Sequence, residues 1–278
     1  CLAKDPGARW QSGRELAAAL RAAAAGQVSS SGGGWWRGLR SLFAGEEEAS
    51  PAGSAAVLEP IREFEAGSLQ RIRIVTHIGD ISLSRAEGSR VRAEFVPDDC
   101  GQCRPLMAVE GSTLRLEVQG GGRRRTCRGG FKVFAPAGLE AEVLTGTGDV
   151  SVQGMEGGLK VTTGTGDVSL DAVRGGLSLK SGTGDVTGVV YSEDADFKSG
   201  TGDLSLEWSA VPAAGKVVVK TGSGDADLSF PDGTRMSVAF KSGVGSLTSA
   251  FGTDPDAGFS VVMTSGAGDL ELKKVQRP

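Results

Sequence analysis

The chain has 278 residues, with 39% apolar and 5% aromatic residues, 44 glycines and a net charge of −4. So much glycine without a repeating triplet excludes a collagen-like rod and favours a turn-rich β protein. The slightly acidic balance excludes a general nucleic-acid-binding protein, which needs a concentrated basic surface, and no apolar run reaches the roughly 18 residues that a membrane span requires.

Residues 1–25 are predicted to be helical. Ser12 and Glu15 have the spacing of a capping box, and a run of alanines ends at Gly26. Because the first residue is Cys1 and not a methionine, we expect the sequence to be a piece of a longer protein.

The segment CLAKDPGARWQSGRELAAAL (1–20) resembles the closing part of a bacterial Ser/Thr protein kinase domain, with Asp5, Pro6 and Arg9 matching its DP-x-x-R pattern. The resemblance implies that Arg9 pairs with a glutamate of a kinase core that this chain lacks. The chain contains no glycine-rich loop with its lysine, no HRD motif and no DFG motif, so we expect it to transfer no phosphate by itself.

Residues 26–60 are rich in Gly, Ser, Ala and Pro and are predicted to form a flexible linker. The linker contains WWRGLRSLF (35–43), whose apolar residues could share a helical face opposite Arg37 and Arg40. Two interpretations stay open: an interfacial membrane helix, or a short segment that docks on a neighbouring domain or stays mobile. In the first, peripheral membrane contact would be made by Trp35, Trp36, Leu39 and Phe43.

From residue 61 the apolar pattern changes to a period of two. Apolar and polar residues alternate in 71–75, 81–83 and 114–118, which predicts half-buried strands. We therefore expect residues 61–278 to form one all-β domain.

A four-residue turn, G-[TS]-G-D, recurs along the second half of the chain. Successive turns are 18 to 23 residues apart, and a degenerate version, GVGS, lies at 243–246. The turns begin at Gly146, Gly164, Gly182, Gly200, Gly222 and, as GAGD, Gly266. A period of this length predicts a β-solenoid, in which each coil buries its apolar face by stacking on its neighbours.

One coil has the sequence GLKVTTGTGDVSLDAVRG (158–175), a strand, a GTGD corner and a second strand. Apolar residues alternate with polar ones along both strands, so Lys160 and Ser169 are expected to face outward. The residues expected to face inward are Leu159, Val161, Val168 and Leu170.

Coils stacked about 4.8 Å apart place equivalent corner residues in columns. Threonines would form one column, and a second would contain Asp149, Asp167, Asp185, Asp203, Asp225 and Asp269. The aspartates have two candidate roles, hydrogen bonds to backbone amides at the turn as an Asx motif, or calcium binding as in a nonapeptide β-roll. The β-roll places its aspartate one residue later, so the spacing favours the Asx role and we expect no calcium.

The stretches HIGDISL (77–83) and FKVFAPAGLEAEVLTGTGDVSV (131–152), with the later coils, resemble the bacterial toast-rack β-repeat family, also described as adhesin-like. The resemblance covers residues 61–278. It implies a stacked all-β domain that is not an enzyme, often joined to envelope or regulatory modules, and it supplies no catalytic residue.

The motif CGQC (100–103) is the one stretch with reactive-looking side chains. Its position in a loop between strands leaves open free thiols or a local disulfide, a zinc site, and a redox site. Zinc bound by three cysteines and one histidine would use Cys100, Cys103, Cys127 and His77. No nucleophile elbow accompanies the histidine, so we expect no Ser-His-Asp site and no other cofactor.

A second loop, GGGRRRTCRGG (120–130), concentrates arginines. It is either a solvated hairpin loop or a contact for an anionic partner.

These patterns favour a non-catalytic interaction or scaffold module, appended to a bacterial kinase, that presents its columns to a protein partner or to a second copy of itself. The alternative is a metal- or ligand-sensing module that uses the cysteines or the acidic column, and a surface adhesin ranks third.

A kinase works where ATP is, and no segment after residue 25 is long enough to cross a bilayer, so we expect a cytoplasmic location. Residues 35–43 could at most hold the chain against the inner membrane surface. The cytoplasm keeps thiols reduced, which favours free or metal-bound Cys100 and Cys103.

Overall fold

The computed structural model describes residues 60–97, 103–120 and 127–275, and the regular elements in these ranges are β-strands. The predicted helix of residues 1–25, the tryptophan-rich segment and Cys100 lie outside the described residues. Within the described ranges, no helix is long or apolar enough to cross a bilayer. The expectation of an all-β architecture after residue 61 is confirmed.

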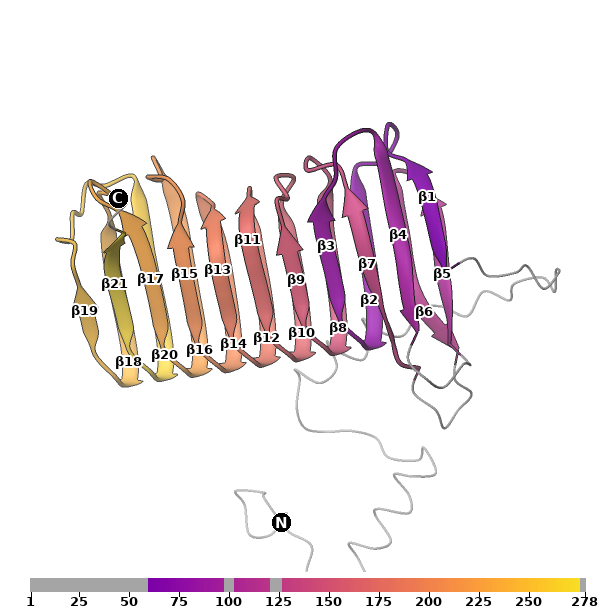
Figure 1. The fold of residues 1–278 in the computed structure, drawn as a ribbon. Helices are drawn as coiled ribbons and strands as arrows, with labels where there is room; N and C mark the ends of the chain where they lie inside the picture. Colours follow the sequence, from indigo (N-terminus) through magenta and orange to yellow (C-terminus); the bar gives the residue numbers. More distant parts are fainter. Residues whose placement is uncertain (1–59, 98–102, 121–126, 276–278) are drawn as a thin grey trace, which may run out of the picture. The chain divides into compact units, whose positions relative to one another are not determined.

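Two sheets run along the described part of the molecule, one behind the other in Figure 1. The first has eleven strands, in the spatial order β1 (Ile61–Glu65), β4 (Arg90–Pro97), β7 (Gly129–Ala135), β3 (Ile81–Arg85), β9 (Val150–Gln153), β11 (Val168–Arg174), β13 (Val186–Tyr191), β15 (Leu204–Trp208), β17 (Ala226–Pro231), β21 (Leu270–Val275) and β19 (Leu247–Ser249).

The second sheet has ten strands. Their spatial order is β18 (Ser237–Val244), β20 (Phe259–Ala267), β16 (Gly215–Ser223), β14 (Asp194–Thr201), β12 (Leu177–Thr183), β10 (Leu159–Thr165), β8 (Glu140–Thr147), β2 (Arg71–Ile78), β6 (Thr113–Gly120) and β5 (Cys103–Glu110).

Each coil consists of one strand of the ten-stranded sheet, a corner and one strand of the eleven-stranded sheet, as in β10 and β11. Neighbouring coils pair in parallel and in register, so Thr165 lies between Thr147 and Thr183. The solenoid and its threonine column are therefore confirmed.

At both ends, however, the coils do not stack in sequence order (Figure 1). The β20–β21 coil lies between the β16–β17 and β18–β19 coils, and the β6–β7 coil lies outside the β2–β3 coil. The spacing of the repeats predicted neither exchange, because it carries no information about which coil pairs with which.

Inward-facing side chains of the two sheets form one core. In the coil of residues 158–175 the four residues expected to face inward are buried, whereas Lys160 and Ser169 are exposed, as predicted. The longer coils accommodate aromatic rings: Trp208 lies 4.5 Å from Phe230 between ring centroids, and its indole N–H donates to a backbone carbonyl at 2.9 Å.

The corners are tight because neighbouring backbones approach one another closely there. Gly166 has a φ of +140°, and a Cβ at this position would collide with the carbonyl oxygen of Gly148 in the adjacent coil. A Cβ at Gly164 would meet the carbonyl of Gly146 in the same way. Both glycines of the G-x-G-D turn are thus required by the spacing of the coils as well as by the turn itself.

The alternation of faces predicts unequal effects of two adjacent substitutions. Val168→Asp buries an unpaired carboxylate where the native side chain is 1% exposed, so we expect it to lower the free energy of unfolding by about 3 kcal/mol or more. Ser169→Asp, on the outer face, should cost less than about 1 kcal/mol. Urea unfolding of both variants measures the difference, and equal losses would show that the inward face is assigned wrongly.

Candidate interaction surface

The corner aspartates are joined to one another from coil to coil. The Asp185 backbone N–H, for example, donates to Asp167 Oδ1 at 2.9 Å. The same bond recurs at 2.8 to 2.9 Å along a column that we call the corner ladder: Asp80, Asp149, Asp167, Asp185, Asp203, Asp225 and Asp269.

Each ladder carboxylate acts together with a backbone group of its own coil. While Asp167 accepts from the Asp185 N–H, the Val168 N–H donates to the Asp185 carbonyl at 2.8 Å. Both backbone polar groups of Asp185 are therefore held by the preceding coil. The Asx motif expected from the sequence places the amide in the same turn; the amide lies in the next coil instead, because in-register stacking brings it within reach.

The two coils whose corners lack an aspartate lie at the two ends of the ladder. Gly130 takes its position in the β6–β7 coil, beside Asp80, and Ser246 takes it in the β18–β19 coil. Ser246 donates to Asp269 Oδ1 from its backbone N at 2.6 Å and from Oγ at 3.0 Å. At the β18–β19 end, a serine corner between Asp225 and Asp269 would leave the Asp269 amide without a carboxylate acceptor; the exchanged order lets Asp269 donate to Asp225 and Ser246 donate to Asp269.

The three predicted zinc ligands that the structure describes, His77, Cys103 and Cys127, do not form a zinc site. Cys103 forms a disulfide with Cys127, with 5.4 Å between their Cα atoms, and His77 is exposed on β2. The expectation of a free or zinc-bound Cys103 is corrected, because the start of β5 and the residues before β7 meet at this end of the stack. Among the described residues, no three His, Cys, Asp or Glu side chains are placed to hold a metal ion.

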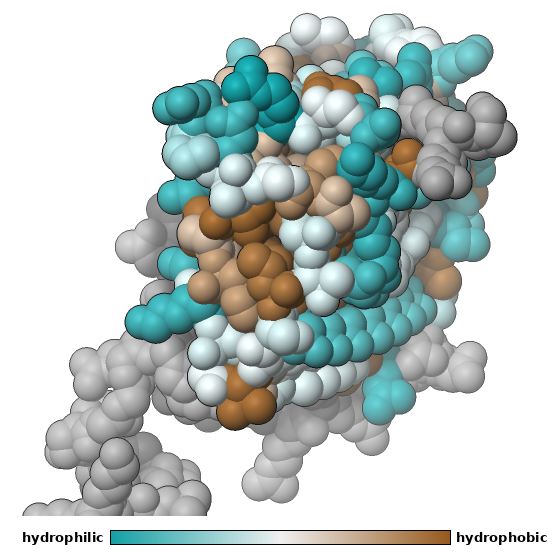
Figure 2. Space-filling view, turned by 90° about the vertical axis from the view of Figure 1, so that its left-hand side faces the viewer, coloured by the Kyte–Doolittle hydropathy of each residue, from teal (hydrophilic) through white to brown (hydrophobic). Residues whose placement is uncertain are grey.

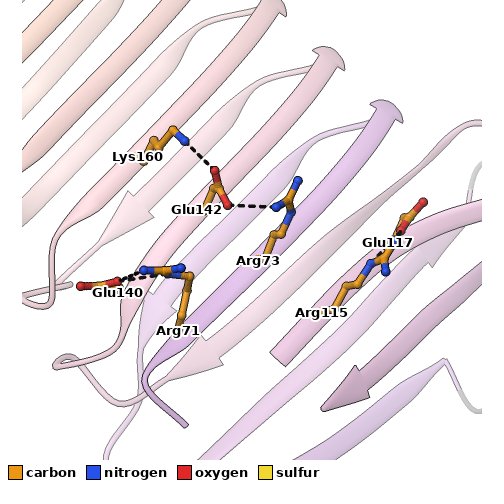
Figure 3. Close-up of polar contacts among 7 residues, drawn as sticks. All are labelled: Arg71, Arg73, Arg115, Glu117, Glu140, Glu142 and Lys160. Atoms are coloured by element: carbon orange, nitrogen blue, oxygen red, sulfur yellow. Dashed lines mark hydrogen bonds and ion pairs between the residues drawn. The ribbon is translucent and has the colours of Figure 1, made fainter. Parts of the chain in front are cut away.

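Charged side chains on the outer face of the ten-stranded sheet pair across strands near β2 (Figure 3). Glu142 on β8 accepts from Lys160 on β10 at 2.7 Å and lies 3.4 Å from Arg73 on β2. Partial burial opposes ionisation of Glu142, but the Lys160 hydrogen bond and the charges of Arg73, Lys160 and Arg71 outweigh it, so the pKa of Glu142 lies below its ordinary value. Opposite charges are thus matched in this part of the sheet.

Further along the same face the charges are not matched. Lys180, Lys198 and Lys220 occupy equivalent positions on β12, β14 and β16, and we call them the cationic row. Lys198 pairs with Asp196, but Lys180 and Lys220 are exposed and no carboxylate of the described residues pairs with them. Neighbouring strands lie about 4.8 Å apart, so these like charges repel one another.

Our sequence interpretation missed this row, although a signal for it was present. A lysine precedes the small residue and glycine of the turn in KSG (180–182), KSG (198–200) and KTG (220–222). Aligning the repeats would have placed the three lysines in one column, but only the register shows that they are adjacent and mostly unpaired.

A column of hydroxyls, also missed, lies beneath the cationic row. Ser181 is buried, and its hydroxyl has no hydrogen-bond partner among the described residues; it borders a cavity of about 20 Å³ that is lined as well by Ser199 and Thr221. That volume accommodates one water molecule. The corner core is therefore partly polar, in contrast to the apolar middle of each coil.

The fold and its corner ladder define a parallel β-solenoid of stacked GxGD coils. The Toastrack DUF4097 family matches residues 67–275, three quarters of the chain, and the chain belongs to this family. None of the curated proteins matches it.

Several solved structures are similar to this chain. A putative adhesin from Bacteroides fragilis NCTC 9343 is 15% identical, with 77% of this chain and 96% of that chain covered and a TM-score of 0.45. A putative cell adhesion protein from Clostridium sporogenes ATCC 15579 is 14% identical, with 77% and 98% covered and a TM-score of 0.40. These names describe those proteins and are not transferred to this chain.

The corner ladder predicts that two substitutions of Asp185 lower the stability by different amounts. Asp185→Ala removes the acceptor of the Asp203 amide and should lower the free energy of unfolding by about 1 to 2 kcal/mol, whereas Asp185→Asn keeps an oxygen there and should cost less than half as much. Thr183→Ala, in the adjacent exposed column, is the control and should change stability by less than about 0.5 kcal/mol. Thermal or urea unfolding measures all three, and equal losses for Ala and Asn would contradict the acceptor role.

The lowered pKa of Glu142 predicts a pH-dependent contribution to stability. The folded state holds the carboxylate ionised to lower pH than the unfolded state does, so its contribution is complete above the ordinary value of 4.5 and is lost as pH falls below it. Glu142→Gln should therefore cost about 1 kcal/mol or less at pH 7 and nothing near pH 3. Glu207→Gln, whose carboxylate pairs with no cation of the described residues, is the control; a Glu142→Gln deficit that stays constant down to pH 3 would refute the assignment.

Proposed function

We propose that residues 61–278 are a non-catalytic interaction module whose cationic row binds an acidic segment of a protein partner. The observation that carries this proposal is the contrast between matched and unmatched charges on one face. Around Glu142 cations and carboxylates alternate from strand to strand, whereas Lys180 and Lys220 lie beside another lysine with no carboxylate partner in the described part of the chain. A ligand with several carboxylates relieves this repulsion on binding.

The fold favours a contact of this kind over catalysis. The parallel stack holds the three lysines in register on consecutive strands of a rigid sheet, so their ammonium groups are presented together without a loop having to be ordered.

Binding of a fluorescein-labelled decaglutamate peptide to the purified chain, followed by fluorescence anisotropy at low salt, tests the proposal. We expect Lys180→Glu/Lys220→Glu to weaken binding at least about tenfold. Lys132→Glu/Arg174→Glu changes the net charge equally at exposed cations on β7 and β11 of the eleven-stranded sheet, and it should weaken binding less than about threefold. Equal losses for the two double variants would exclude the cationic row as the binding site.

We further propose that this module adjoins a Ser/Thr kinase domain and is cytoplasmic, following the resemblance of residues 1–25. The Cys103–Cys127 disulfide is in tension with that location, because cytosolic thiols are usually kept reduced. Maleimide labelling of the protein after acid quenching of its host cells shows whether these thiols are reduced. Labelled Cys103 and Cys127 support a cytoplasmic location, and protected thiols contradict it.

A further inference from the structure

The β18–β19 end of the stack has two open sheet edges. β18 and β19 are the outermost strands of their sheets at the same end, and among the named strands of the described part each pairs with one, β20 and β21. The start of β18 is covered on its outer side, where Thr253 bridges Met236 and accepts at Oγ1 from the Val238 N–H at 3.2 Å, so the open part of this edge begins at Phe240. The outward backbone N–H and C=O groups of such strands are a template for pairing with another strand.

Apolar side chains at this end are incompletely covered. Val238 and Phe240 occupy inward positions whose equivalents in β20 are fully buried, but they are themselves only partly buried. Val244 and Leu247 are 75% and 42% exposed. Figure 2, which views the molecule from this end, shows hydrophobic residues gathered there.

The opposite end is protected by several features that β18 and β19 lack. Antiparallel pairs close it, β1 with β4 and β5 with β6. Its edge strands contain Arg62, Glu63, Glu65, Arg104 and Pro105, residue types that discourage pairing with further strands. In contrast, residues 237–249 contain a single charged residue, Lys241.

We propose that the β18–β19 end binds a second copy of this chain, with β18 of the two copies paired antiparallel across a twofold axis. A nearly uncharged edge meets little repulsion from an identical edge, whereas the charged and closed β1/β5 end offers no matching strand. The contact is therefore isologous and forms a closed dimer, not a filament.

The twofold axis limits the register. In antiparallel pairing, directly opposite residues lie on the same face of the sheet, so the sum of their residue numbers must be even. Pairing over residues 238–242, centred on Phe240, sets this side chain against its counterpart inside the joined core and puts the Ser242 carbonyl of the second copy in the place of Thr253 Oγ1 at the Val238 N–H. On the outer face it sets Lys241 of one copy opposite Ala239 of the other, so no two lysines face each other.

This inference goes beyond the proposed function and is independent of it, because the cationic row lies on β12, β14 and β16. The register predicts that two substitutions of one exposed residue, Ala239, change the dimer affinity in opposite directions. Ala239→Lys places a lysine opposite Lys241 of the second copy, and Ala239→Glu places a carboxylate there. If repulsion between the two net charges of −4 decided the affinity instead, the added lysine would strengthen the dimer and the added glutamate would weaken it.

Sedimentation equilibrium of the purified 278-residue chain, without any partner, measures the dimer. We expect the wild-type chain to reach twice its mass of 28.4 kDa at about 10 to 100 µM. Ala239→Lys should raise the dissociation constant about tenfold, and Ala239→Glu should lower it about threefold. Val109→Lys, at an exposed position of edge strand β5 at the opposite end, should leave the dissociation constant unchanged.

Three outcomes would overturn the proposal: a monomer throughout this concentration range, shifts of the same sign for the two Ala239 variants, or a dimer dispersed by Val109→Lys. Circular dichroism of each variant shows whether it retains the β fold. A variant that has lost its fold is replaced by Val244→Lys/Leu247→Lys at the same end, whose two side chains are already exposed. This pair should raise the dissociation constant at least as much as Ala239→Lys does, and an unchanged dissociation constant would count against the proposal.

Discussion

The structure depends on one repeated interaction, the hydrogen bond from a corner amide to the aspartate of the preceding coil. A slide of one coil by two residues would keep the sheet hydrogen bonds and the inward faces, but the corner bond excludes it, because a carboxylate accepts well only from an amide directly opposite it. The glycines serve the same contact. Without a Cβ at Gly164 and Gly166, the corner backbones come close enough for Asp167 to reach the next coil.

The same interaction explains how the stack ends. A carboxylate at the last corner would have no amide to accept from, and in its place Ser246 donates twice to Asp269. At the other end Gly130 contributes no side chain at all. The ladder therefore terminates without an unused charge, although the backbone edge of β18 from Phe240 onward and the apolar side chains near it stay open. In the final coil, therefore, the hydrogen bonds of the corner are satisfied while the strand edge can still pair with another strand.

The repeated G-[TS]-G-D turn made most of the fold predictable, since its period specifies coils and its neighbours specify which residues, such as Val168, face inward. The coil order was not predictable, because it depends on pairing between coils that are distant in sequence, such as β16 with β20. The Cys103–Cys127 pairing depends on how β5 and β7 meet at one end, which no spacing reveals. The three lysines of the cationic row could be found by aligning the repeats. That they are adjacent follows only from the register, and that Lys180 and Lys220 lack a carboxylate partner among the described residues follows only from the structure.

Every interior coil presents the same two interfaces, one to each neighbour, so whole coils are interchangeable units. Loss or duplication of an 18-residue segment such as 168–185 would bring two equivalent coil surfaces together. The close approach at the corner glycines and the corner hydrogen bonds would then be kept. A duplicated coil with a lysine before its turn would also lengthen the cationic row by one charge. Recombination between repeats could thus strengthen or weaken an electrostatic contact by one lysine at a time. The change would come from the number of coils, with the sequence of each coil left as it is.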